Sequence, residues 1–106
     1  NVTIPYGIDR ISERMFLWCD NLKNVSIPDS VIKIDEYAFQ GCKSMTEITL
    51  PNSVTRIEDG IFYNCSKLTS VTFKGTKEEW NSISKYNWNA GSSVQKVICT
   101  DGEIEI

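Results

Sequence analysis

"IPDSVIKIDEYAFQGC" (residues 27–42) and "LPNSVTRIEDGIFYNC" (residues 50–65) are two versions of one pattern, set 23 residues apart. Proline is second in both stretches, valine fifth, isoleucine eighth, phenylalanine thirteenth and cysteine last. Repetition at a fixed period in this range is typical of solenoids, in which each unit buries its apolar side chains only against its neighbours. The pair therefore predicts a stacked repeat architecture.

The same register extends over most of the 106-residue chain, with three full repeats and the first strand of a fourth. Eight positions of the repeat are apolar in all three full copies, which a chain that is 41% hydrophobic would not produce by chance. We call each set of equivalent residues a column. The eight apolar columns begin at Val2, Ile4, Ile8, Ile11, Met15, Phe16, Cys19 and Leu22.

Each repeat can be divided into local structures. "VTI", "VSI", "ITL" and "VTF" alternate apolar and polar residues, which predicts a half-buried strand that ends at the following proline. A second short strand is expected around Ile11, Ile34 and Ile57, and then a single helical turn that brings a phenylalanine inward. Because stacked strands lie about 4.8 Å apart, the three phenylalanines should form a ladder of aromatic contacts. They are Phe16, Phe39 and Phe62.

The motif "VSIPDSVIKIDEYAFQGCKSMTEITLPNSVTRIEDGIFYNCSKLTSVTF" resembles the BspA-like (Treponema-type) leucine-rich repeats of bacterial surface proteins. The resemblance covers residues 2–73, and "KGTKEEWNSIS" resembles the segment that often closes such arrays. It implies a leucine-rich-repeat solenoid, mostly β with short helical turns, and a secreted or cell-surface location. It also implies adhesion to host proteins or other cells. The first residues, "NVTIPYG", do not read as a secretory signal, so this location is expected from the resemblance alone.

Residues 1–73 are thus expected to form the repeats, and residues 74–106 a capping segment of the same domain. Thr76 and Glu79 form a capping box, which predicts a helix over residues 77–84 with Trp80 on its buried face. "SKYNWNAGSS" (residues 84–93) reads as a loop. Asp101-Gly102 predicts a hairpin at the end of the chain. Together these elements should shield the last repeat.

The beginning of the chain has no comparable cap. Asn1 falls in the column of Asn24, and nothing precedes it to cover Val2 and Ile4. We expect the chain to be the C-terminal piece of a longer array. Its first repeat should be loose or pack against another molecule, including a second copy of an isolated chain.

Composition argues against several classes of function. A formal net charge of -3 disfavours nucleic-acid binding, and the apolar runs are too short to span a membrane. Histidine is absent, which removes the commonest general base and the commonest zinc ligand. We therefore expect no enzymatic activity, no cofactor and no metal. Cys19, Cys42 and Cys65 share one column with side chains pointing the same way, so we expect buried thiols and no disulfide; Cys99 should lie inside a strand.

Three sets of residues are candidates for binding a protein ligand. Polar side chains point outward from the first strand, a basic column follows the second strand, and aromatic residues replace turn residues in some repeats. Each set has a structural alternative: exposed threonine is ordinary in strands, neighbouring Asp35 and Glu58 can neutralise the cations, and the aromatics can pack against a missing upstream repeat or the cap. The sets are Thr3, Ser26, Thr49 and Thr72; Arg10, Lys33 and Arg56; and Tyr6, Trp18 and Tyr63.

Two functions remain open from the sequence. The first is a non-enzymatic protein-binding or adhesion module. The alternative is a structural spacer or cap with no ligand of its own. A contiguous exposed aromatic patch, to which Tyr86 and Trp88 of the tail would add, favours binding; scattered or covered aromatics favour the spacer.

Overall fold

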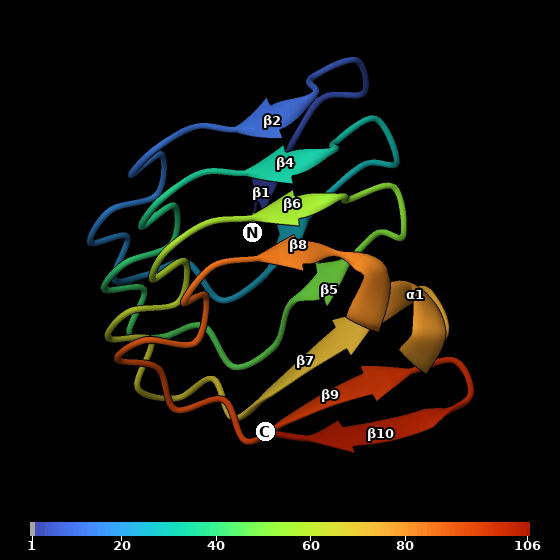
Figure 1. The fold of residues 1–106 in the computed structure, drawn as a ribbon. Helices are drawn as coiled ribbons and strands as arrows, with labels where there is room; N and C mark the ends of the chain where they lie inside the picture. Colours follow the sequence, from blue (N-terminus) through green and yellow to red (C-terminus); the bar gives the residue numbers. More distant parts are fainter. Residues whose placement is uncertain (1) are drawn as a thin grey trace.

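Each 23-residue unit makes one coil of a solenoid in the computed structural model, which describes residues 2–106 (Figure 1). Asn1, and with it the expected match to the column of Asn24, lies outside the described residues. Every coil has a first strand, a turn at the proline, a second strand and a long turn that returns to the next coil. The elements are β1 (Val2–Thr3), β2 (Arg10–Ile11), β3 (Val25–Ser26), β4 (Lys33–Ile34), β5 (Thr49–Leu50), β6 (Arg56–Ile57), β7 (Ser70–Phe73), α1 (Lys77–Ser82), β8 (Ser84–Lys85), β9 (Lys96–Cys99) and β10 (Gly102–Glu105).

The 23-residue step is the hydrogen-bonded register of the strands, which confirms the repeat. The second strands β2, β4, β6 and β8 form one parallel sheet in which Ile11, Ile34 and Ile57 are direct neighbours. The first strands pair as β1 with β3 and as β5 with β7, while β3 and β5 are not paired. Figure 1 shows the proline turns and the long turns at opposite edges of the stack.

The predicted aromatic ladder runs through the core and confirms the stacking of the coils. The ring centroids of Phe16 and Phe39 lie 5.2 Å apart and those of Phe39 and Phe62 lie 5.9 Å apart, with interplanar angles of 6° and 23°. Phe39 and Phe62 are fully buried, whereas Phe16 in the first coil is only partly buried. Each phenylalanine ring is therefore buried mainly by the coils on either side of it.

The long turns consist of tight hydrogen-bonded turns and contain no helix. In each coil the amide three residues after the phenylalanine donates back to it, as from Cys42 to the Phe39 carbonyl at 3.2 Å. Two positions per coil have the left-handed backbone that interrupts a helix. The two columns are Arg14, Tyr37, Gly60 and Asn87, and Trp18, Gly41, Asn64 and Gly91.

The tail begins with the predicted capping box. The Thr76 hydroxyl accepts from the Glu79 amide at 3.1 Å, and the Glu79 carboxylate accepts from the Thr76 amide at 2.9 Å. The helix α1 ends at Ser82, two residues before the predicted end, because Ile83 is extended. The hairpin of β9 and β10 around Asp101 is confirmed.

The loop predicted for residues 84–93 is confirmed as turns from residue 86 onward, but Ser84–Lys85 form strand β8, and the segment as a whole makes a further coil. Strand β8 pairs with β6, and the step from Arg56 to Ser84 is 28 residues where the other coils have 23. The helix α1 takes up the extra length. The following turn bonds to the coil before it, with Asn87 and Gly91 carbonyls accepting from Gly60 and Asn64 amides. Strand β9 then pairs with β7, so the tail extends both sheets.

Trp88 is buried in this further coil, which corrects the expectation of an exposed aromatic. Its ring meets Phe62 edge-to-face at 6.2 Å and Trp80 at 5.4 Å. The left-handed residues Asn87 and Gly91 on either side repeat the geometry of the preceding turns and direct Trp88 inward. It therefore closes the bottom of the aromatic ladder.

The first coil leaves part of the apolar columns uncovered. Val2 and Met15 are exposed, and Ile8, Phe16 and Cys19 are only partly buried, while their counterparts in the second coil are more deeply buried. Whether this end is loose or packs on another molecule stays a prediction. Within residues 2–106, no helix combines the length and the apolar composition that a membrane crossing requires.

Replacing a phenylalanine of the ladder by alanine should destabilise the protein most in the middle of the ladder. We expect Phe39→Ala to lower the free energy of unfolding by about 3–5 kcal/mol, the range for a fully buried phenylalanine. Phe16→Ala should lower it by less than half as much, because the ring has a neighbouring coil on one side only. Urea denaturation followed by circular dichroism measures both. Equal losses in the two variants would contradict a core shared between coils.

Candidate functional site

The outward polar column lies on the first sheet, as the alternation predicted. Thr3, Ser26 and Thr72 are exposed and Thr49 is half-buried. Thr3 is in register with Ser26, and Thr49 with Thr72. The column is therefore two pairs of neighbours, separated where β3 and β5 are unpaired.

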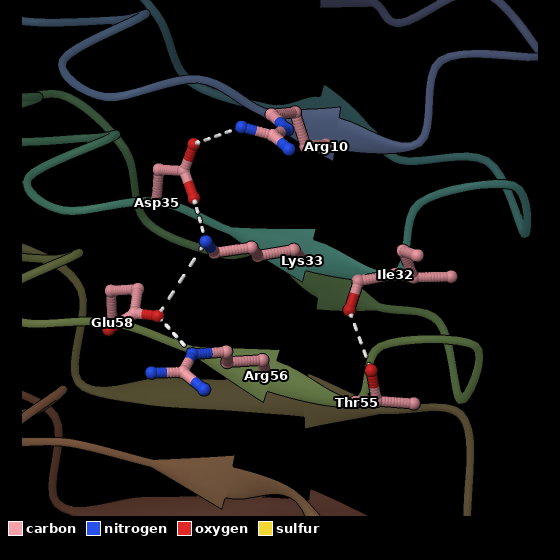
Figure 2. A network of polar contacts seen from close by, with 7 residues as sticks. All are labelled: Arg10, Ile32, Lys33, Asp35, Thr55, Arg56 and Glu58. Carbon is pink, nitrogen blue, oxygen red and sulfur yellow. Dashed lines mark hydrogen bonds and ion pairs between the residues drawn. The ribbon is translucent and has the colours of Figure 1, made fainter.

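The basic column belongs to a zigzag of alternating charges on the second sheet, which we call the charge ladder (Figure 2). Lys33 lies between two carboxylates, with its Nζ 3.3 Å from Asp35 Oδ1 and 3.9 Å from Glu58 Oε2. Arg10 lies 3.7 Å from the other oxygen of Asp35, and Arg56 donates to Glu58. Each carboxylate thus binds the cation of its own coil and that of the preceding coil.

This arrangement favours the structural alternative for the basic column. The strand register places Arg10, Lys33 and Arg56 side by side, where like charges would repel one another. Asp35, which is buried, and Glu58 offset that repulsion. Exposed ion pairs contribute only about 0–1 kcal/mol each, but here they tie adjacent coils at a fixed register.

The structure separates the three candidate aromatics. Tyr6 is 81% exposed at the first proline turn, whereas Trp18 and Tyr63 are 50% and 38% exposed on the long turns at the opposite edge. Trp18 and Tyr63 flank Gly41, because the Trp18 ring covers Gly41 and the Gly41 amide donates to the Tyr63 carbonyl at 2.8 Å. Tyr86 is exposed beside the end of β8.

On the long turns, each aromatic side chain covers a glycine of the next coil. A Cβ atom on Gly41 would meet the Trp18 ring at 2.2 Å, one on Gly60 would meet Tyr37 at 2.5 Å, and one on Gly91 would meet Tyr63 at 2.3 Å. Sequence reasoning missed Tyr37. The available signal was its spacing from Gly60, which equals that of Trp18 from Gly41.

We call Trp18, Tyr37 and Tyr63 the aromatic edge. The rings of Tyr37 and Tyr63 meet edge-to-face at 6.1 Å. Two cations lie over the rings: Arg14 is 5.2 Å from the centre of Tyr37 and Lys43 is 5.7 Å from that of Trp18. The edge therefore presents partly exposed aromatic rings next to cationic groups.

The cysteines of the repeats lie in the long turns, where two of their thiols bind backbone carbonyls. All four cysteines of the chain are free, and the thiols of Cys42 and Cys65 donate to the carbonyls of Phe16 and Phe39 at 3.2 and 3.0 Å. The neighbouring Cys65 thiol and burial raise the pKa of Cys42, which disfavours a nucleophilic thiolate there. In the described part of the chain, no cluster of three or more histidine, cysteine or acidic side chains is placed to hold a metal ion.

Lys85 ends an apolar column at the bottom of the stack. It is in register with Ile57, yet its Nζ donates to the carbonyls of Trp80 and Ile83 at 2.7 and 3.0 Å and lies 5.1 Å from the centre of the Trp80 ring. Burial lowers the pKa of this ammonium group. Its bonds go to the Trp80 carbonyl of α1 and to the Ile83 carbonyl just after the helix, so Lys85 belongs to the cap.

Comparison with known proteins places this geometry among repeat proteins. A family model described as the BspA type leucine rich repeat region matches residues 1–106 in six copies. The crystal structure of a leucine rich cell surface protein from Faecalibacterium prausnitzii A2-165 is similar, with 36% sequence identity and a TM-score of 0.67. The match covers 71% of this chain and 20% of that longer chain. No curated protein matches the chain.

Because Trp18 contacts Gly41, substitutions at the two positions should have non-additive effects on the free energy of unfolding. We expect Gly41→Ala to lower the free energy of unfolding by about 1–3 kcal/mol, because its φ of 77° is strained for alanine and the new methyl meets the Trp18 ring. Adding Trp18→Gly should recover part of that loss. Gly7→Ala is the control for strain alone, since it has positive φ and nothing within 4 Å. Simple additivity of Gly41→Ala and Trp18→Gly would contradict the contact.

Removing Lys33, the central cation of the charge ladder, should lower the stability of the protein. We expect Lys33→Met to lower the free energy of unfolding by about 1 kcal/mol more than Lys23→Met, an exposed lysine outside the ladder. Because salt screens these pairs, the difference should shrink in concentrated sodium chloride. Equal effects of the two variants at low salt would contradict a stabilising role.

Proposed function

The chain belongs to the BspA type leucine-rich repeat family, and from that membership we propose that it is a non-enzymatic protein-binding module of a secreted or cell-surface protein. The aromatic edge is the proposed contact surface. The partner is a protein exposed outside the cell, such as a host matrix protein or a protein of another cell surface. Similarity to a cell surface protein of Faecalibacterium supports this location.

The observation that carries the proposal is the backbone of Trp18. Its φ is 58°, in a column where the other coils have Gly41, Asn64 and Gly91, residues that tolerate the left-handed region. A bulky residue there is strained by about 1–3 kcal/mol, and such strain clusters at functional sites. Half of the Trp18 side chain nevertheless faces solvent. The fold by itself favours glycine or asparagine at this position.

The surroundings of Trp18 support the same surface. Tryptophan, tyrosine and arginine are the residue types that dominate binding hot spots, and the edge combines Trp18, Tyr37 and Tyr63 with Arg14 and Lys43. In addition, the rings are held by glycines beneath them, so little side-chain freedom is left to lose on binding. The charge ladder, by contrast, has its cations already paired.

The alternative is a spacer or cap without a ligand. It is favoured by the same contacts, because a ring that packs on a glycine of the next coil also stabilises the stack. Tyr6, exposed at the opposite edge, does not join the aromatic edge. Measured binding separates the two functions.

Binding by the isolated chain to a panel of purified extracellular-matrix proteins tests the proposal. We expect Trp18→Gly with Tyr63→Ala to weaken binding at least about tenfold, since loss of hot-spot residues removes about 2 kcal/mol or more. The matched control is Tyr6→Ala with Tyr86→Ala, which removes two aromatics that are more exposed. Circular dichroism verifies that both variants fold.

Two results would count against the proposal. Equal binding by wild type and by the Trp18 and Tyr63 variant would reject the aromatic edge. An absence of binding to every protein of the panel, and to whole bacterial and host cells, would favour the spacer.

A further inference from the structure

The first sheet is open between the second and third coils. Strand β3 pairs with β1, and β5 pairs with β7, but β3 and β5 are not hydrogen-bonded neighbours. The same two coils are joined elsewhere, by β4 and β6 and by the Phe39 amide, which donates to Ile61 at 3.0 Å. The opening is therefore local to this sheet.

A polar cleft of about 240 Å³ occupies the opening. Its lining residues carry a side-chain amide, two hydroxyl groups and an ammonium group. The lining residues are Asn24, Val25, Ser26, Ile27, Thr49 and Lys74. Two members of the outward polar column, Ser26 and Thr49, thus meet here.

The backbone at the cleft has unused hydrogen-bonding groups. Successive residues of a parallel strand turn their N–H and C=O groups alternately to the two neighbouring strands. The Ser26 carbonyl accepts from Ile4 at 3.1 Å, so the groups of Val25 and Ile27 face β5. No hydrogen bond joins the Ile27 amide to the Thr49 carbonyl, where a continued ladder would have one. These groups are therefore free to bind water or a ligand in the cleft.

Lys74 supplies a positive charge to the cleft. It stands in the column of Pro28 and Pro51, and its amide donates to the Leu50 carbonyl at 2.9 Å. Although it belongs to the fourth coil, it lines a cleft bounded by Asn24–Ile27 of the second coil. Within residues 2–106, Lys74 forms no ion pair, in contrast to the lysine of the charge ladder. Glu47, two residues before Thr49, does not line the cleft.

We infer that the cleft between β3 and β5 binds a carboxylate, supplied by an aspartate or glutamate side chain of the protein partner. The inference rests on the proposed protein-binding function and names a second contact of that partner. A carboxylate is acceptor-only and matches an ammonium group, two hydroxyls and free amides. Insertion of a whole strand would need about 10 Å between β3 and β5, which the pairing of β4 with β6 prevents.

Titration of the ¹⁵N-labelled chain followed by nuclear magnetic resonance tests the inference. The probes are a glutamate-rich peptide, the same peptide with glutamine in place of glutamate, and free glutarate. We expect saturable shifts of the Val25, Ile27 and Thr49 amides with the glutamate peptide and none with the glutamine peptide. Lys74→Met should weaken binding about tenfold, as loss of a charge-assisted contact, while Lys74→Arg should retain it. Lys67→Met, another exposed lysine, is the matched control.

Three results would overturn the inference. They are an absence of saturable shifts at these amides, equal binding by Lys74→Met and wild type, and shifts with glutarate but not with the peptide. The last would assign the cleft to small free carboxylates.

The titration is independent of the aromatic edge, so the Trp18→Gly and Tyr63→Ala variant should give the same shifts. If that variant and wild type bind matrix proteins equally while the shifts persist, only the aromatic edge is rejected. If matrix binding depends on the aromatic edge but no shifts occur, only the carboxylate cleft is rejected.

Discussion

The stacking of Phe39 between Phe16 and Phe62 is the contact on which the rest of the structure depends. A single coil has two strands of two residues and cannot enclose a core of its own. The phenylalanine and isoleucine side chains become buried only when a second coil lies beside the first at the spacing of a hydrogen-bonded sheet. The constant 23-residue step is therefore the condition for having a core at all, and any insertion must be confined to an edge.

That condition also determines the surface. Residues 23 positions apart become direct neighbours whether or not they attract one another. Lys33 consequently lies beside Arg10 and Arg56 and requires the carboxylates of Asp35 and Glu58 between them. By the same step, the large ring of Trp18 lies above position 41, where only a glycine leaves room for it. A substitution on this surface therefore affects a pair of positions 23 residues apart and not a single residue.

Departures from the repeat mark the places with a distinct role. Lys85 stands in an isoleucine column and, by donating to the carbonyls of Trp80 and Ile83 at the end of α1, ends the stack with a charge. Asp101, in the hairpin turn, accepts from the Lys77 amide at 2.9 Å and joins the hairpin to the start of α1. Lys74 stands in a proline column and reaches the open part of the first sheet. Trp18 occupies a left-handed position that the fold would give to glycine.

The sequence by itself determined the period, the apolar columns, the Phe16–Phe39–Phe62 ladder, the capping box at Thr76 and the hairpin at Asp101-Gly102. Each of these follows from spacing along the chain or from local turn chemistry. Only the tertiary structure decided that Trp88 is buried, that Tyr37 joins Trp18 and Tyr63 while Tyr6 does not, and that β3 and β5 separate. The reason is physical. Trp88 enters the core through a coil that α1 lengthens, and the aromatic edge depends on how each ring lies over a glycine of the next coil. The open cleft depends on the missing hydrogen bonds between β3 and β5. The repeat indicated only one of these contacts, through the 23-residue spacing of Tyr37 from Gly60.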